Sequence, residues 1–145
     1  MSKKITLLGS TGSIGTQSLD VIRAQGYEVF GLSAHSHVDK ILQQIEEFHP
    51  KYVCMTDPDA AAKLDAALSG RAGAPKLLTG PEGLRELAAL DGPDVVLNSV
   101  VGIAGLLIGA SSSTINKLKI IKKHPFLSNS LVKFLNLQKE FIMVF

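Results

Sequence analysis

The chain has 145 residues, a formal net charge of +2 and 46% hydrophobic residues, which is typical of one globular domain with a buried core. No apolar run is long enough to span a membrane, so we expect no membrane association. The net charge is too small to indicate a particular partner, and we expect no nucleic acid as a partner. The single cysteine excludes an internal disulfide, and with no signal peptide before the first strand it predicts a cytoplasmic location.

The first predicted strand and helix flank a glycine-rich turn. The apolar run Ile5–Leu8 leads into three glycines spaced three apart, and helical spacing of apolar residues then continues to Gln25. Glycine allows a tight turn and a close backbone approach, and a helix N-terminus offers free N–H groups, so this arrangement is typical of a diphosphate-binding loop. The alternative is a tight strand–helix turn without a ligand. The residues predicted to bind the cofactor here are Gly9, Ser10, Thr11, Gly12, Ser13 and Ile14.

The residues of this turn have separate expected roles. Gly9 should end the strand, Gly12 should face the phosphates, and Gly15 should let the helix lie close to the sheet. The hydroxyl groups of Ser10, Thr11 and Ser13 could add phosphate contacts. Ser13 is also a plausible N-cap of the helix.

A second strand, Tyr27–Ser33, closes a βαβ unit, and its end bears on the choice of cofactor. Enzymes that prefer NAD usually carry an acidic residue here, whereas this chain has His35, Ser36 and His37 and no acid before Asp39. Neutral donors do not repel a 2′-phosphate, so we predict NADP and a contact from each of these three residues. A polar loop without a ligand is the alternative. Two histidines without further ligands seldom bind a metal.

The remaining periodicity predicts a regular alternation of helices and strands. His49 and Pro50 are expected to end the helix Val38–Phe48. Cys54 is expected as a small core residue, and Asp57 with Pro58 forms an N-cap and N1 pair. The alternation predicts an α/β fold, a Rossmann-like, doubly wound and mainly parallel sheet. The predicted elements are the helix Val38–Phe48, the strand Tyr52–Met55, the helix Asp59–Leu68, the strand Lys76–Leu78, the helix Pro81–Leu90 and the strand Asp94–Ser99.

The strand that begins at Asp94 runs into a second glycine-containing junction. Ligands of open α/β sheets bind beyond the carboxyl ends of the strands, so this junction should face the same crevice as Gly12, near the nicotinamide half of the cofactor. A plain strand–helix junction explains the pattern equally well. The residues predicted to line the crevice are Ser99, Val100, Val101 and Gly102.

The composition changes abruptly at Ser111. Residues 1–110 contain nine Lys/Arg and twelve Asp/Glu, a net charge of −3, whereas residues 111–145 contain six lysines against Glu140 alone, a net of +5. We therefore predict a nucleotide-binding domain over 1–110 and an atypical Lys/Phe-rich tail over 111–145. Within the tail, Leu118–Ile121 could be a sixth strand.

Three stretches together resemble 1-deoxy-D-xylulose 5-phosphate reductoisomerase. Residues 5–22 read ITLLGSTGSIGTQSLDVI, residues 48–53 read FHPKYV, and residues 98–107 read NSVVGIAGLL. The resemblance covers residues 1 to about 107. It implies an NADPH-dependent oxidoreductase of non-mevalonate isoprene biosynthesis, homodimeric and inhibited by fosmidomycin. Such an enzyme converts a sugar phosphate to 2-C-methyl-D-erythritol 4-phosphate with a divalent metal, Mg or Mn.

Carried over residue by residue, the family's NADPH contacts fall on Thr11, Gly12, Ser13 and Ile14. The second cofactor loop of the family, often Gly-x-Asn, falls on residues 35–37, where histidines replace the glycine and asparagine. The family's Asn-Lys-Glu motif falls by counting on Lys123-His124-Pro125, which does not match it. The resemblance places the metal-binding carboxylates and the catalytic domain beyond Phe145, and none has a counterpart here. The sequence therefore predicts a truncated or frameshifted enzyme that is catalytically incompetent alone and has neither catalytic nor metal-binding residues.

Two other classes of function stay open from the residues alone. A non-catalytic nucleotide-binding module could use the basic tail to bind a partner, since lysines supply phosphate contacts. An epimerase-like reductase would need a Tyr-x-x-x-Lys pair, and neither Tyr27 nor Tyr52 has a lysine four residues later.

Overall fold

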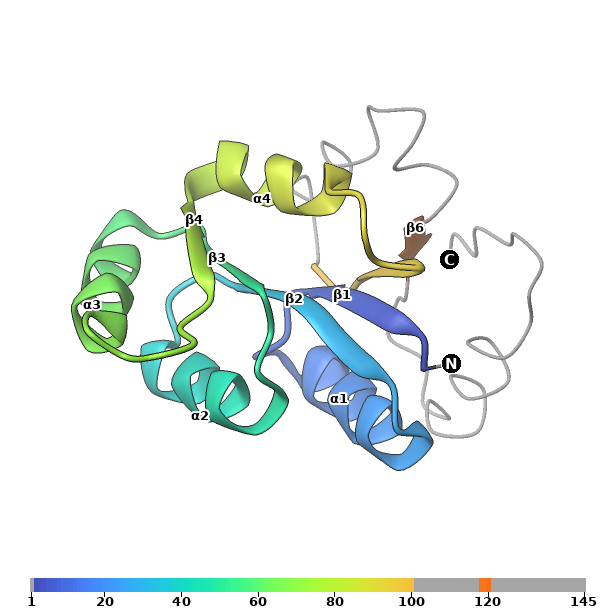
Figure 1. The fold of residues 1–145 in the computed structure, drawn as a ribbon. Coiled ribbons are helices and arrows are strands. Elements are labelled where there is room, and N and C mark those ends of the chain that lie inside the picture. Colours follow the sequence, from blue (N-terminus) through green and yellow to red (C-terminus); the bar gives the residue numbers. More distant parts are fainter. Residues whose placement is uncertain (1, 101–117, 121–145) are drawn as a thin grey trace.

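The computed structural model describes residues 2–100 and 118–120, in which strands and helices alternate from β1 to β5 (Figure 1). A sixth strand, β6, follows in the C-terminal segment. In chain order the elements are β1 (Lys4–Leu8), α1 (Ser13–Gln25), β2 (Glu28–Ala34), α2 (Val38–Phe48), β3 (Tyr52–Met55), α3 (Pro58–Leu68), β4 (Lys76–Thr79), α4 (Gly80–Ala89), β5 (Val95–Asn98) and β6 (Leu118–Ile120).

The strands form one sheet in the order β4-β3-β2-β1-β5-β6, and every pairing is parallel. The order runs outward from β1 in one direction to β4, and resumes on the other side of β1 with β5. This reversal between β1 and β5 is the topological switch point, where the crevice of an open α/β sheet lies beyond the carboxyl ends of the strands. The predicted fold class is thus confirmed, and the two strands that flank the switch point are those that lead into the two predicted junctions.

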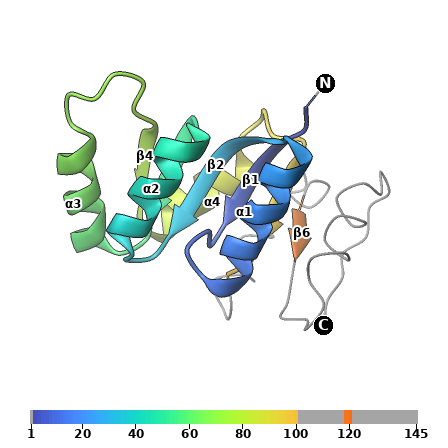
Figure 2. The same ribbon diagram turned by 90° about the horizontal axis from the view of Figure 1, so that it is seen from below.

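Helices cover both faces of the sheet. Figures 1 and 2 show α1, α2 and α3 on one face and α4 on the other. Each face has its own core. The core on the first face includes Ile22, Ile41 and Leu64, and the core under α4 includes Leu84 and Leu87. A sheet buried on both faces needs strands that are apolar throughout, and β5 is buried at all its positions.

Most predicted boundaries agree with the structure within one or two residues. The bounds of α2 and β3 are those predicted, and α1 ends at Gly26, which has the left-handed φ of 66° expected of a terminating glycine. The strand predicted over Leu118–Ile121 is present as β6, paired with β5. The segment 111–145, predicted as an atypical tail, thus adds an edge strand to the sheet; its other residues lie outside the described ones.

The predicted cap of α3 is present, and its removal should destabilise the fold. The carboxylate of Asp57 accepts a hydrogen bond of 2.9 Å from the Ala60 N–H, and Pro58 occupies the first turn. Replacing Asp57 with alanine should lower the free energy of unfolding by about 1 kcal/mol, because one helical N–H loses its acceptor. Urea unfolding would measure this, with Asp57→Asn, which keeps an acceptor, as the control. Equal loss in both variants would contradict the capping role.

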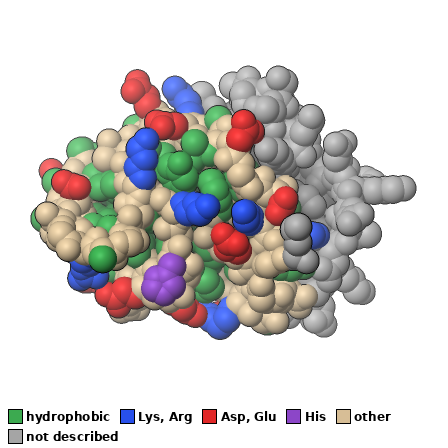
Figure 3. Space-filling view, in the orientation of Figure 1, with side chains coloured by type: hydrophobic (Ala, Val, Ile, Leu, Met, Phe, Trp, Pro, Cys, Tyr) green, Lys and Arg blue, Asp and Glu red, His purple; other side chains and the backbone are tan. Residues whose placement is uncertain are grey.

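The surface carries charges of both signs. On the face seen in Figure 3, basic and acidic side chains are interspersed over the described residues and do not gather by sign. Within those residues, no helix has the length and apolar character that crossing a bilayer requires.

Candidate functional site

The glycine turn between β1 and α1 is held by β2. β1 ends at Leu8, and Gly9 follows with a φ of 80°, a conformation that favours glycine. The N–H groups of Gly9 and Ser10 both donate to the carbonyl oxygen of Ser33, at 3.1 and 2.8 Å. The Ser33 hydroxyl oxygen accepts a further bond of 2.9 Å from the Gly9 N–H. The turn is therefore fixed against the neighbouring strand.

Gly15 and Gly12 have opposite surroundings. A Cβ atom on Gly15 would lie 2.0 Å from the Gly9 carbonyl oxygen and 2.7 Å from backbone atoms of Ser10, so α1 packs directly on the turn. A Cβ atom on Gly12 would meet nothing within 4 Å in the described structure. Gly15 therefore serves close packing, as predicted, and Gly12 borders open space at the mouth of the turn.

The N-cap of α1 is Gly12, so the prediction of Ser13 as N-cap is wrong. Gly12 is extended, with φ −74° and ψ 174°, and its carbonyl oxygen accepts the first helical bond from the Thr16 N–H at 2.9 Å. Ser13 is already inside the helix, where its side chain cannot cap. No side chain among the described residues caps this end of α1. Within the described part of the chain, its first-turn N–H groups and the positive end of the helix dipole thus meet no side-chain acceptor.

The hydroxyl groups of the turn differ in what they can reach. Ser10 is fully buried, and its hydroxyl donates to the side-chain oxygen of Gln44 at 2.6 Å. This hydroxyl, predicted to contact a phosphate, is therefore already paired inside the protein. Thr11 is 7% exposed, whereas Ser13 is exposed and Ile14 is half-buried at the start of α1.

The second predicted loop, residues 35–37, lies beyond the carboxyl end of β2 and is tied to the end of β3. The Nδ1 atom of His35 is 2.8 Å from the Thr56 hydroxyl oxygen, and the Asp57 N–H donates to the His35 carbonyl oxygen at 3.1 Å. Ser36 and His37 are exposed. The imidazole of His35 is thus directed to the β3 loop, while Ser36 and His37 stay accessible.

Ser36 and His37 line a groove of about 760 Å³ between α2 and α3. Its charged side chains come from both helices and from the loop before α3. The carboxylates of Asp57 and Asp59 were not expected here, because they follow β3 and only the fold brings them beside the β2 loop; Asp57 is the cap described above. The charged residues that line the groove are Asp39, Lys40, Asp57, Asp59 and Lys63.

The junction after β5 lies on the other side of the switch point from β2, next to the end of β1. Ser99 is buried, and its hydroxyl lies 2.7 Å from the carbonyl oxygens of both Leu8 and Gly9, so its side chain joins β5 to the first turn. The Val100 N–H donates to the Asn98 side-chain oxygen at 2.9 Å. The described part of this junction, Ser99 and Val100, therefore lies beside Gly9. Val101 and Gly102, also predicted as cofactor contacts, lie outside the described residues.

Three residues that hold the first turn were not predicted from the sequence: Ser33, Lys40 and Gln44. Gln44 both accepts from the Ser10 hydroxyl and donates to the Ser10 carbonyl oxygen at 3.0 Å, and Lys40 donates to the Thr11 carbonyl oxygen at 3.0 Å. The sequence contains only a weak signal for Gln44 and Lys40. Gln44 is a polar residue on the apolar face of α2, between Ile41 and Ile45, and Lys40 lies one turn earlier.

The described residues offer neither a metal centre nor a reactive thiol. No group of three or more His, Cys, Asp or Glu lies together in them. Cys54 is fully buried, and burial raises the pKa of its thiol to about 12, so the thiol stays protonated near neutral pH. The prediction that Cys54 is a core residue is confirmed.

Comparisons with known proteins agree with the geometry. The family model described as 1-deoxy-D-xylulose 5-phosphate reductoisomerase matches residues 5–129, which extends past residue 107 and includes β6. The reductoisomerase of Clostridium botulinum is 46% identical over 106 residues, covering 72% of this chain and 28% of that protein. That of Thermosynechococcus vestitus is 39% identical over 107 residues, covering 72% and 26%. The chain thus spans about a quarter of the length of these relatives.

Solved structures of the same enzyme share the fold. A reductoisomerase in complex with magnesium superposes with a TM-score of 0.75 at 30% identity, covering 92% of this chain and 35% of that one. The enzyme of Zymomonas mobilis in complex with NADPH superposes with a TM-score of 0.72 at 28% identity, covering 83% and 31%. With the family model matching most of its residues, and the glycine turn at the switch point of the same sheet, this chain belongs to the 1-deoxy-D-xylulose 5-phosphate reductoisomerase family.

Proposed function

We propose that this chain binds NADPH, with the diphosphate on the turn Gly9–Gly12 and the N-terminus of α1. The observation that carries the proposal is the uncapped start of α1 beside Gly12, whose missing side chain leaves open space. Amide groups of Ser13 and Ile14 can donate to phosphate oxygens there without displacing any described side chain. Thr11 and Gly12 then form the floor of the phosphate site.

The preference for NADPH over NADH is assigned to the β2 loop. Residues 34–38 carry no carboxylate, and Ser36 and His37 are exposed donors at the mouth of the groove. Of the acidic residues in the groove, Asp57 is bound to the Ala60 N–H. A 2′-phosphate placed at Ser36 and His37 meets hydrogen-bond donors and no carboxylate of the β2 loop itself.

The junction after β5 is assigned to the nicotinamide half of the cofactor. Val100 lies close to Gly9, since a Cβ atom on Gly9 would lie 3.1 Å from a methyl group of Val100. Ser99 acts by holding this junction against the turn, and Val101 and Gly102 complete the proposed contacts. When bound, NADPH supplies a hydride, and the residues of this junction orient its nicotinamide ring.

The complete reaction is proposed for the longer proteins that the chain resembles. In these, NADPH and a divalent metal convert 1-deoxy-D-xylulose 5-phosphate to 2-C-methyl-D-erythritol 4-phosphate. The described residues do not fit a metal, since no ligand group occurs among them, and we assign the metal no role here. We propose that the chain, which spans about a quarter of these relatives, binds the cofactor without turning over the sugar phosphate.

Other predictions from the sequence remain proposals. These are a nucleotide-binding unit over 1–110 with a distinct segment over 111–145, a cytoplasmic location and a homodimeric family assembly. The alternative of a non-catalytic module with a partner-binding basic tail finds no support in the comparisons, all of which point to the reductoisomerase.

Two measurements on the full chain test the function. NADPH at about a hundred times its Kd should stabilise the fold by about 2.7 kcal/mol, which thermal unfolding detects as a rise in Tm, and NADH should stabilise less. NADPH absorbance should stay constant with 1-deoxy-D-xylulose 5-phosphate and Mn²⁺ present. An unchanged Tm at millimolar NADPH would refute cofactor binding, and sustained NADPH oxidation would refute the proposed lack of turnover.

A further inference from the structure

The face of α2 that meets the glycine turn carries two polar residues one helical turn apart. Gln44 is buried and forms two hydrogen bonds with Ser10, one to its hydroxyl and one to its carbonyl oxygen. Lys40, four residues earlier, is exposed, and its ammonium group donates to the carbonyl oxygen of Thr11 at 3.0 Å. Residues four apart lie on one face of a helix, so α2 contacts two successive residues of the turn.

The two contacts have different physical consequences. The Gln44–Ser10 pair is neutral and lies inside the fold, where it satisfies buried polar groups. The Lys40–Thr11 contact places a full positive charge on a carbonyl oxygen in the turn that is proposed to hold a diphosphate. Without that charge, the partial negative charge of this oxygen would oppose the incoming phosphates.

We propose that Lys40 is a positioning residue for the diphosphate. It fixes the Thr11–Gly12 peptide and cancels the negative potential of the Thr11 carbonyl oxygen, so that the amides of the α1 N-terminus can bind phosphate. This inference rests on the proposed function, and it adds a residue from outside the glycine motif. Because the diphosphate is common to both dinucleotides, Lys40 should support NADPH and NADH equally.

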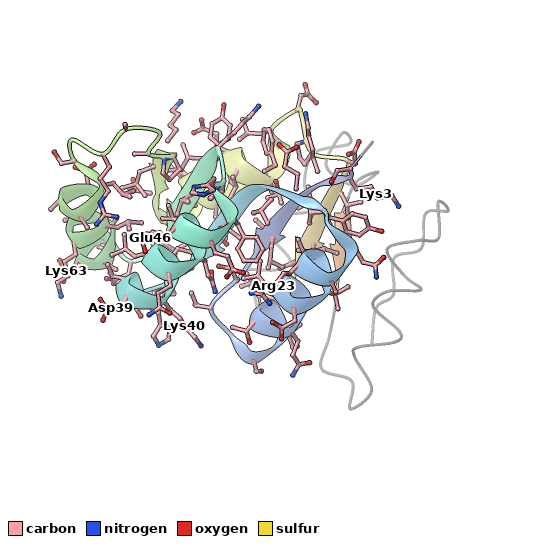
Figure 4. All side chains as sticks on the ribbon, turned by 60° about the horizontal axis from the view of Figure 1, so that its bottom comes forward. Lys3, Arg23, Asp39, Lys40, Glu46 and Lys63 are labelled. Atoms are coloured by element: carbon pink, nitrogen blue, oxygen red, sulfur yellow. The ribbon has the colours of Figure 1, made fainter. Side chains whose placement is uncertain are left out.

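Lys63 provides a matched control. It lines the same groove from α3, is exposed, and its ammonium group forms no hydrogen bond or ion pair with any other described residue. Figure 4 shows Lys40 at the start of α2 and Lys63 on α3, farther from the turn between β1 and α1. Replacing either lysine with methionine removes one charge from the groove, but only Lys40→Met removes the contact with Thr11.

The test compares the parent chain with Lys40→Met, Lys40→Arg and Lys63→Met, after circular dichroism shows that each is folded. Lys40→Met should weaken NADPH and NADH by about tenfold or more each, the size expected for a hydrogen bond to a charged group. Lys40→Arg should recover most of the affinity, since a guanidinium group can donate to the same oxygen. Lys63→Met should bind NADH as the parent does.

A spectroscopic readout tests the positioning role without any ligand. The Thr11 carbonyl carbon is bonded to the Gly12 nitrogen, so Lys40→Met should shift the Gly12 ¹⁵N resonance of the free protein, and Lys63→Met should not. An unshifted Gly12 resonance in Lys40→Met overturns the proposal. The proposal is also overturned if Lys40→Met weakens the binding of NADPH but not that of NADH, because Lys40 would then act on the 2′-phosphate. If the parent binds no NADPH, the proposed function fails, and the Gly12 resonance still decides the contact.

Discussion

Replacing Gly15 with alanine is expected to lower the free energy of unfolding by about 3 kcal/mol, the upper end of the range for overpacking. The added Cβ atom would lie 2.0 Å from the Gly9 carbonyl oxygen and 2.7 Å from the Ser10 backbone. Both are main-chain atoms, and hydrogen bonds to Ser33 hold them in place. The structure can relieve this contact only by moving α1 away from the turn.

Urea unfolding followed by circular dichroism would measure the loss. Gly12→Ala is the matched control, since it makes the same change three residues earlier, in open space and in an extended conformation that alanine accepts. Its stability should fall by no more than about 1 kcal/mol, since alanine is a poorer N-cap than glycine. A Gly15→Ala protein as stable as Gly12→Ala would show that α1 does not pack on the turn as described.

Replacing Gly12 with valine is expected to weaken NADPH binding at least tenfold, about 1.4 kcal/mol, while the protein stays folded. The φ of −74° and ψ of 174° at Gly12 suit a β-branched residue. The new methyl groups would instead fill the space beside the α1 N-terminus, where the diphosphate is proposed to lie. The effect should therefore fall on the ligand and not on the fold.

Isothermal titration with NADPH, beside a Tm measurement for each variant, separates the two effects. Gly12→Ala should show a smaller loss of affinity than Gly12→Val, because less of the space is filled. A Gly12→Val protein that binds NADPH as the parent does would move the diphosphate away from this turn.

Local signals in the sequence were sufficient to predict the elements. The apolar periodicity over Val38–Phe48 gave the bounds of α2, and the Asp57–Pro58 pair identified the start of α3. The fold class followed from the alternation of helices and strands, and the observed sheet order places the Gly9–Gly12 turn and the residues directly after β5 at the switch point. The predicted helices, strands and caps each depend on residues that are close in the sequence.

The parts that were missed depend on contacts between distant segments. Ser33, Lys40 and Gln44 hold the turn from 23 to 34 residues away, and Asp59 enters the groove from the helix after β3. The wrong cap at Ser13 has a local cause. Serine is a strong N-cap former, but here the chain already has helical hydrogen bonding at Gly12, so the helix starts one residue earlier.

The most direct test of the central claim is an NMR titration of the ¹⁵N-labelled chain with NADPH. The amide resonances of Thr11, Gly12, Ser13 and Ile14 should shift progressively and saturate, while those of the loop 70–74, between α3 and β4, should stay in place. Resonances of the turn that do not move at millimolar NADPH would contradict binding of the diphosphate at the start of α1.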